Sequence, residues 1–207
     1  MQDKIDVINE LFKDGKDVSR LSSLVDKDTA MHILSMINKS LADEKPIDIS
    51  ETYRTLLEIS KIDHIDMQQL LATFELTLKN DISYYPDMAC ETLSAIVQVN
   101  PAAEPEVFKF IQSSENQNYK FYYTLRHYMP NMKDKIYEKV LQDIKADKID
   151  YDKNIDDLID FCDNEQVLRE LLLRSVGGKI TEDTDLLMKC FSNIEDKDAL
   201  LRALDNG

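Results

Sequence analysis

Residues 66–80 read DMQQLLATFELTLKN, and this stretch decides the fold class of the chain. Its large apolar residues recur at steps of one, three and four, which places them on one face of an α-helix: Leu70, Leu71, Phe74 and Leu78. Asp66 stands directly before the pattern, where an aspartate accepts hydrogen bonds from the free N–H groups of a first turn. The stretch therefore predicts an amphipathic helix with one buried face.

The same spacing recurs in both directions along the chain, and no segment alternates convincingly as a strand would. Prolines, capping residues and the Gly177-Gly178 pair separate the segments. The expected helices begin near Asp3, Asp28, Ser50, Asp66, Pro86, Pro105, Asn118, Asn131, Asn154, Asn164, Thr181 and Asp196. The pattern predicts an all-α fold, an array of antiparallel helix pairs that forms either a short irregular α-solenoid or an irregular helical bundle.

Residues 86–93, PDMACETL, resemble the second helix of a HEAT repeat, with a proline at the start and Ala89 and Leu93 four residues apart. From about residue 66 onward the helix pairs are similar to the HEAT/armadillo class of solenoids. The regular aspartate and arginine positions of those repeats are missing, which keeps the irregular bundle open. We expect an N-terminal helical segment over 1–62 packed on a repeat-like array over 63–207, or alternatively one domain over 1–207.

Glycine is scarce, with four residues among 207, and this excludes several kinds of site. Dinucleotide fingerprints, phosphate-binding P-loops and nucleophile elbows each need several glycines in a tight turn. Gly177 and Gly178 together form a helix stop, and Gly207 is the last residue given. The remaining glycine, Gly15, follows the first expected helix.

The chain is strongly acidic, with 40 acidic and 25 basic residues and a formal charge of −15. This balance argues against direct binding of nucleic acid or an anionic membrane, because phosphate contacts need Lys or Arg. No apolar run is long enough to span a bilayer, and the first residues have no signal-peptide pattern. Three widely spaced cysteines are typical of reduced thiols. We expect a cytoplasmic protein, with its oligomeric state open.

Residues suited to catalysis are sparse, and we expect no catalytic residue, cofactor or metal. His32, His64 and His127 have no second histidine or cysteine at ligand spacing. Residues 152–163 match several positions of a calcium loop, but Asp157 replaces the required glycine and Asp163 the bidentate glutamate. An all-α enzyme that uses scattered carboxylates or a metal stays as the second alternative.

Two stretches favour protein binding. Residues 143–163 contain the highest density of acidic residues in the chain. Residues 118–128 contain five aromatic residues and an arginine, residue types that are enriched at interface hot spots. The candidate partner-binding residues are Tyr119, Tyr123 and Arg126 as anchors, with Asp152, Asp156 and Asp160 as an acidic rim. We expect a non-enzymatic interaction module for a basic protein. The first alternative is a small acidic inhibitor, of immunity or anti-defence type, that mimics nucleic acid and blocks a basic enzyme.

Overall fold

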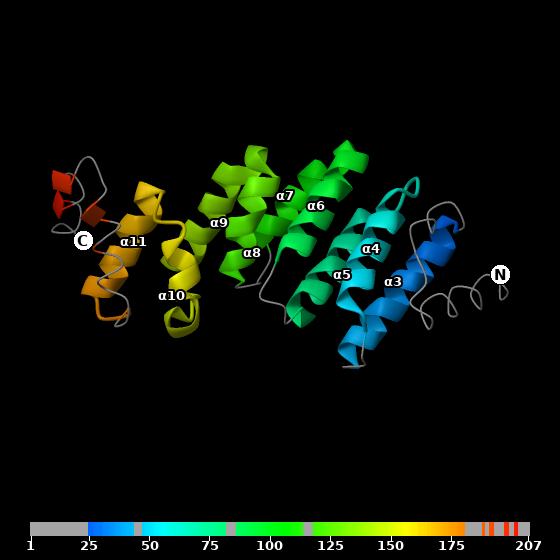
Figure 1. The fold of residues 1–207 in the computed structure, drawn as a ribbon, viewed down its shortest axis with the longest axis horizontal. Helices are drawn as coiled ribbons and strands as arrows, with labels where there is room; N and C mark the ends of the chain where they lie inside the picture. Colours follow the sequence, from blue (N-terminus) through cyan, green and yellow to red (C-terminus); the bar gives the residue numbers. More distant parts are fainter. Residues whose placement is uncertain are drawn as a thin grey trace. The chain divides into compact units, whose positions relative to one another are not determined.

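The computed structural model describes residues 25–43, 47–81, 86–113 and 118–180, with positions 188, 191–192, 197–198 and 201–202. Across these residues it holds nine α-helices and two short 3-10 helices, and no strand (Figure 1). The prediction of an all-α fold is confirmed. The helix expected from Asp3 lies outside the described residues, and those expected from Thr181 and Asp196 lie largely outside them.

The chain divides into two compact units, Met1–Asn116 and Gln117–Gly207. The expected boundary near residue 62 lies inside the first unit. The helices on its two sides, α4 (Ile49–Ser60) and α5 (Met67–Asn80), pack directly against each other. Residues on both sides of position 62 therefore share one core.

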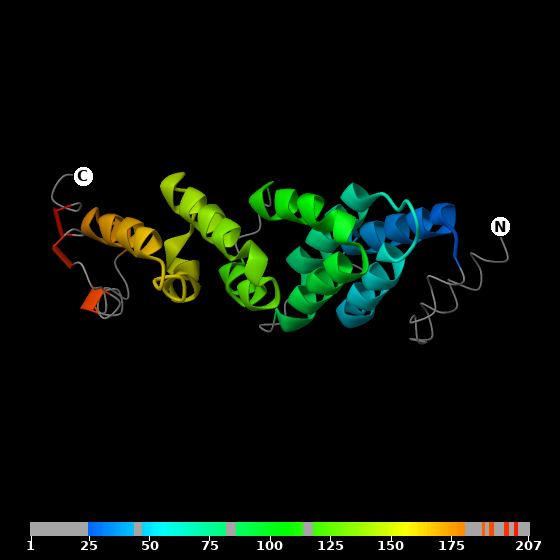
Figure 2. The same cartoon turned by 90° about the horizontal axis from the view of Figure 1, so that it is seen from above.

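The first unit arranges its described helices in two rows (Figures 1 and 2). One row holds α3 (Lys27–Ala42), α5 and α7 (Glu104–Ser113), and the other holds α4 and α6 (Asp87–Val99). Each helix packs against the next but one in the chain: α3 on α5, α4 on α6, and α5 on α7. The short 3-10 helix η1 (Pro101–Ala103) joins α6 to α7. This layout buries one face of every helix between its neighbours.

Aspartates begin the first three described helices. The side chains of Asp26, Asp48 and Asp66 each accept a hydrogen bond from a backbone N–H three residues later. Asp66 confirms its prediction, whereas Asp28 and Ser50 are not the caps that the sequence indicates. Asp28 lies within the first turn of α3, and Ser50 lies within α4. In each case the actual cap is an aspartate two residues earlier.

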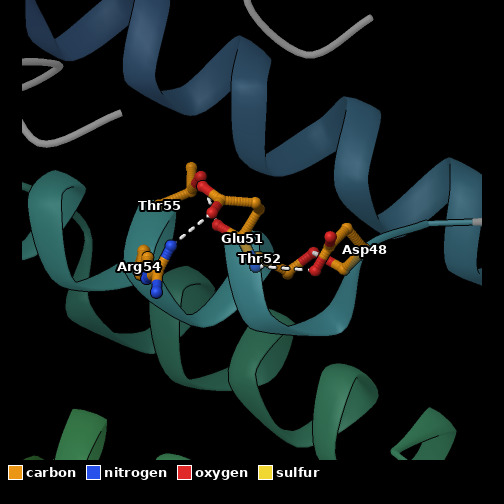
Figure 3. A network of polar contacts seen from close by, with 5 residues as sticks. All are labelled: Asp48, Glu51, Thr52, Arg54 and Thr55. Atoms are coloured by element: carbon orange, nitrogen blue, oxygen red, sulfur yellow. Dashed lines mark hydrogen bonds and ion pairs between the residues drawn. The ribbon is translucent and has the colours of Figure 1, made fainter. Parts of the chain in front are cut away.

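Figure 3 shows the polar side-chain contacts at the start of α4. Asp48 Oδ1 accepts from the Glu51 N–H at 3.0 Å, while the Thr52 hydroxyl donates to the Asp48 carbonyl at 2.7 Å. The Thr55 hydroxyl donates to the Glu51 carbonyl at 2.7 Å, and Arg54 pairs with the Glu51 carboxylate at 2.5 Å. The Asp48 side chain therefore satisfies one of the N–H groups that a helix start leaves open, and the two threonine hydroxyls bond to carbonyls of the same helix start.

The core of the first unit is apolar and centred on aromatic rings. Phe74 is fully buried, with the rings of Tyr53 and Phe110 at 5.5 and 5.9 Å. Threonines are the most frequent buried polar residues, and several of their hydroxyls donate to the carbonyl four residues earlier, as Thr73 and Thr77 do at 2.9 and 2.8 Å. Hydrogen bonds within one helix thus satisfy these polar atoms without a partner on another helix.

The second unit repeats the next-but-one packing. It holds α8 (Tyr119–Tyr128), η2 (Pro130–Met132), α9 (Lys133–Lys145), α10 (Tyr151–Ile159) and α11 (Glu165–Val176). α8 packs against α9 and α10, and α9 packs against α11.

Two helix starts in this unit differ from the prediction. Asn131 does not cap α9, because Pro130 begins η2, which runs directly into α9. Asn154 lies inside α10, where its amide donates to the Asp150 carbonyl at 2.8 Å. Asn118 and Asn164 do cap α8 and α11 as predicted, and Gly177 is the C-cap of α11.

Two helix ends in the second unit depend on left-handed residues. Asp147 after α9 has φ 57°, and Gly178 after α11 has φ 73°, where glycine adopts this conformation without steric cost. The Asp147 carboxylate forms ion pairs with Lys179 and, at 3.8 Å, with Arg174. The two helix ends are thereby joined by charge.

Candidate interaction surface of the second unit

The aromatic helix α8 begins where its sequence predicts. Asn118 Oδ1 accepts from the Phe121 N–H at 2.9 Å, and the helix ends before Pro130. Phe121 and Leu125 are fully buried, as their shared face predicts. Tyr128, expected on that face, is the last residue of the helix and is 38% exposed.

Arg126 is the centre of a polar network that joins three segments. Its Nη1 donates to the two carboxylate oxygens of Asp163 at 2.8 and 3.1 Å, and to the Tyr137 hydroxyl. The Tyr137 hydroxyl in turn donates to Asp163 Oδ1 at 2.6 Å. The network therefore ties α8 and α9 to the turn between α10 and α11.

Aromatic rings enclose the same guanidinium. Its carbon lies 3.9 Å from the centroid of the Tyr123 ring, and the rings of Tyr137 and Phe161 follow at 5.7 and 5.8 Å. A planar guanidinium over a tyrosine face gains cation–π attraction while its edge keeps its hydrogen bonds. The Tyr123 ring and the Asp163 carboxylate therefore both fix the position of the Arg126 guanidinium.

Burial and neighbouring charges shift the pKa values of Arg126 and Tyr137. Burial by itself would lower the pKa of Arg126, but the Asp163 carboxylate and Tyr137 raise it above its usual range. Burial raises the pKa of Tyr137, and the hydrogen bond to Asp163 adds to the effect. Arg126 therefore stays cationic and Tyr137 stays protonated, as structural hydrogen-bond donors.

Tyr119 belongs to a second buried network between α8 and α9. Its hydroxyl donates to Asp143 Oδ2 at 3.3 Å, and Lys139 Nζ donates to the same carboxylate at 2.7 and 2.5 Å. Lys139 is 4% exposed and Asp143 is 9% exposed. Burial and the neighbouring Asp143 raise the pKa of Tyr119 above its usual range. The Tyr119 hydroxyl therefore joins α8 to a desolvated ion pair that lies within α9.

The structure therefore places the three candidate anchors differently from one another. Tyr119 is fully buried and Arg126 is 8% exposed, so both act inside the unit. Tyr123 is partly exposed at the edge of the Arg126 network. All three lie on one side of α8, as their spacing indicates, but α9 and α10 pack over much of that side.

The candidate acidic rim lies on the exposed side of α10. Asp152 and Asp156 lie on α10, and Asp160 is its C-cap; the three follow each other at four-residue steps along one side of the helix, and all three are exposed. Within the described part of the chain, none of the three forms an ion pair; the lysine on the same helix, Lys153, pairs with Asp150 at 2.6 Å. We call these three residues the α10 stripe.

The stripe and the Arg126 network are neighbours. Partial burial raises the pKa of Asp160, Arg126 and Lys120 oppose that shift, and Asp156 and Asp163 add to it. Asp157 lies closer to α8 and accepts a hydrogen bond from the Lys120 backbone N–H. The structure thus brings Tyr123, Arg126 and Asp160 together, as binding candidates on α8 and α10.

Tyr137 also lines a groove that no sequence pattern predicted. Four of its lining residues come from one face of α9: Asp134, Tyr137, Glu138 and Leu141. Asn164, Glu165 and Gln166, at the start of α11, form the opposite wall of this hollow of about 390 Å³. Its two walls are more than twenty residues apart in the chain, so no local spacing could reveal it.

The residues considered for catalysis or metal binding lie at the surface. His32, His64 and His127 are all exposed. Residues 152–163, which resemble part of a calcium loop, form α10 and the turn after it. Among the described residues, no three His, Cys, Asp or Glu side chains are grouped to hold a metal ion. Burial raises the pKa of the Cys90 thiol, so that it stays protonated and unreactive.

In the described part of the chain, no helix has both the length and the apolar character needed to cross a membrane. A comparison with family models, curated proteins and solved structures finds no match to this chain.

Proposed function

We propose that this chain is a non-enzymatic, acidic α-helical module that binds a basic protein surface through helix faces of its second unit. The observation that carries the proposal is the α10 stripe, three exposed carboxylates on one helix face with no ion pair in the described part of the chain. Free carboxylates at regular spacing offer a partner sites for lysine or arginine. The resemblance to HEAT-type arrays agrees with this role.

The physical mechanism is electrostatic steering followed by local contact. A net charge of −15 attracts a basic partner from a distance and speeds association. Tyr123, partly exposed beside Arg126, then supplies aromatic contact area next to the stripe. Arg126 and Tyr119 have the different task of holding α8 against its neighbours, so that the stripe is presented on a rigid support.

The proposal places the module in the cytoplasm, where the thiols of Cys90 and Cys162 would stay reduced. If the partner is a nucleic-acid-binding enzyme, the same stripe would compete with phosphates and the chain would act as an inhibitor. That outcome is tested by the experiment below.

The test compares two triple variants of the full chain in affinity capture from an extract of the source cells. The first neutralises the stripe (Asp152→Asn, Asp156→Asn, Asp160→Asn). The matched control removes three exposed charges in the first unit (Asp28→Asn, Asp63→Asn, Glu91→Gln), so both variants have the same net charge. Quantitative mass spectrometry at low and raised salt measures each captured protein.

We expect a basic protein that the wild type and the control retain and the stripe variant loses. With that protein purified, the stripe variant should raise Kd by about tenfold or more, and the difference should shrink as salt screens it. Equal capture by both variants would contradict the proposal. A captured nuclease or polymerase whose activity the chain blocks would identify the inhibitor class.

A further inference from the structure

The groove between α9 and α11 combines a rigid floor with a charged rim. Tyr137 is 7% exposed, and its hydroxyl is fixed by Asp163 at 2.6 Å and by Arg126. The Phe161 ring meets the Tyr137 ring edge-on at 5.8 Å. On the opposite wall, Asn164 Oδ1 accepts from the backbone of α11 at 3.0 and 3.2 Å. Both walls are therefore held in place before any ligand arrives, which reduces the entropy cost of binding.

The charge of the groove is unbalanced. Asp134, Glu138 and Glu165 line it, and no lysine or arginine is among its lining residues. The Glu138 carboxylate has an ion pair with Lys135 at 3.1 Å, but both side chains are exposed, and such a pair contributes little. The groove thus attracts a cation, with Tyr137 and Leu141 available to an apolar stem.

The same unit already contains an arginine that is bound by a tyrosine ring and a carboxylate. There Arg126 lies 3.9 Å from the Tyr123 ring and donates to the Asp163 carboxylate. The Tyr137 ring also has Lys133 Nζ at 5.6 Å, so this ring already has a cation nearby. A tyrosine face with adjacent carboxylates matches an arginine, whose planar guanidinium stacks and donates at the same time.

We propose that this groove receives an arginine side chain from a basic protein partner, with the stem on Leu141 and Tyr137 and the guanidinium at Glu138 and Glu165. The inference rests on the proposed function, since it specifies one contact of the same basic partner. It adds a second recognition site in the second unit, formed by elements other than the α10 stripe.

The test uses the full chain, isotopically labelled, and a capped Gly-Gly-Arg-Gly-Gly peptide, with lysine and citrulline counterparts. Two-dimensional NMR titration gives Kd and the residues that shift. We expect the arginine peptide to shift signals of 134–141 and 164–166, to bind more tightly than the lysine peptide, and the citrulline peptide not to bind. If the NMR signals of the groove residues do not shift at about 10 mM arginine peptide, a concentration that would detect even very weak binding, the inference is overturned.

Variants make the assignment specific. Glu138→Gln with Glu165→Gln should raise the peptide Kd about threefold or more, whereas Lys133→Gln, which removes the neighbouring cation, should lower it. The stripe variant should bind the peptide as the wild type does. If the stripe variant loses the peptide and the groove variant retains it, the groove inference fails while the proposed function stands. If cell capture is independent of the stripe but the peptide still binds the groove, the proposed function fails and the groove site remains.

Discussion

The two units solve the problem of buried polar groups in different ways. In the first unit, threonine hydroxyls bond within their own helices, and the buried contacts between helices are mainly apolar, around Phe74. In the second unit, Arg126, Lys139 and Asp143 are buried. Arg126 on α8 bonds to Tyr137 on α9 and to Asp163 in the turn after α10, and Asp143 accepts from Tyr119 on α8 as well as from Lys139 on its own helix. The first unit therefore depends on packing, and the second on both packing and paired charge.

The two units differ in how narrowly their buried contacts fix the positions of the helices. Apolar surfaces tolerate small shifts between helices, whereas a desolvated ion pair is favourable in a narrow range of geometries. The surface proposed to bind a partner lies in the second unit, beside these pairs. We infer that the buried charges set the orientation of α8, α9 and the turn after α10, which a binding surface requires.

The largest effect is expected from the apolar core. Phe74→Ala should destabilise the first unit by about 3–5 kcal/mol, since it removes a fully buried ring and leaves a cavity beside Tyr53 and Phe110. Urea unfolding followed by circular dichroism measures the change. Phe74→Leu, which keeps most of the apolar volume, should lose clearly less. Equal losses would show that cavity volume does not control this core.

Breaking the buried ion pair should have a comparable or slightly smaller effect. Asp143→Ala leaves Lys139 buried without its carboxylate, at a cost of about 3 kcal/mol or more. An apolar replacement of the whole cluster (Lys139→Met, Asp143→Leu, Tyr119→Phe) should recover most of that loss in the same urea assay. If the triple variant is as unstable as Asp143→Ala, the pair contributes net stability and the comparison between the units must be revised.

A smaller effect concerns pH and Asp157. Partial burial, with nearby Asp160 and Asp156, raises the pKa of this carboxyl in the folded state, although Lys120 opposes the shift. Between the unfolded and folded pKa values the folded state binds more protons, so its stability falls as pH rises through that window. Asp157→Asn should therefore raise Tm by about 1–2 °C at pH 7.

The gain from Asp157→Asn should vanish near pH 3, where the wild-type carboxyl is protonated in both states. Thermal unfolding at the two pH values checks this. A gain that is equal at both values would assign the effect to the amide side chain rather than to removal of charge.

The smallest effect is expected for the threonines of the first unit. Thr77→Val keeps the shape of a fully buried side chain and removes only a hydroxyl that donates within its own helix. The stability of the full chain should change by less than about 1 kcal/mol. A larger loss in urea unfolding would mean that this hydroxyl also bonds between helices, which would bring the two units closer in character.

The sequence predicted the helices better than their first residues. Asp66, Asn118 and Asn164 cap as expected, each directly before the apolar pattern of its helix. At α3 and α4 an aspartate also stands two residues before the predicted cap, and local spacing does not choose between the two positions. In both helices the earlier aspartate is the N-cap, so each helix begins before the predicted residue.

The candidate site was predicted in part. The α10 stripe is exposed, as acidic residues at four-residue steps indicate, whereas Tyr119 and Arg126 are buried. Aromatic residues and arginine are common both at protein interfaces and in buried hydrogen-bond networks. Composition alone therefore could not tell whether Tyr119 and Arg126 are exposed binding residues or buried structural ones. Asp163, which decides the position of Arg126, follows it by 37 residues.

By itself, the sequence determined the helical segments, the absence of glycine-rich phosphate sites and the acidity, because these depend on local hydrogen bonding, backbone freedom and residue counts. Only the tertiary structure decided that α9 and α10 cover the aromatic face of α8, that Asp163 and Asp143 bind its side chains, and that α9 and α11 enclose a groove. These contacts join residues far apart in the chain, and their geometry follows from how whole helix faces pack, which local periodicity does not specify.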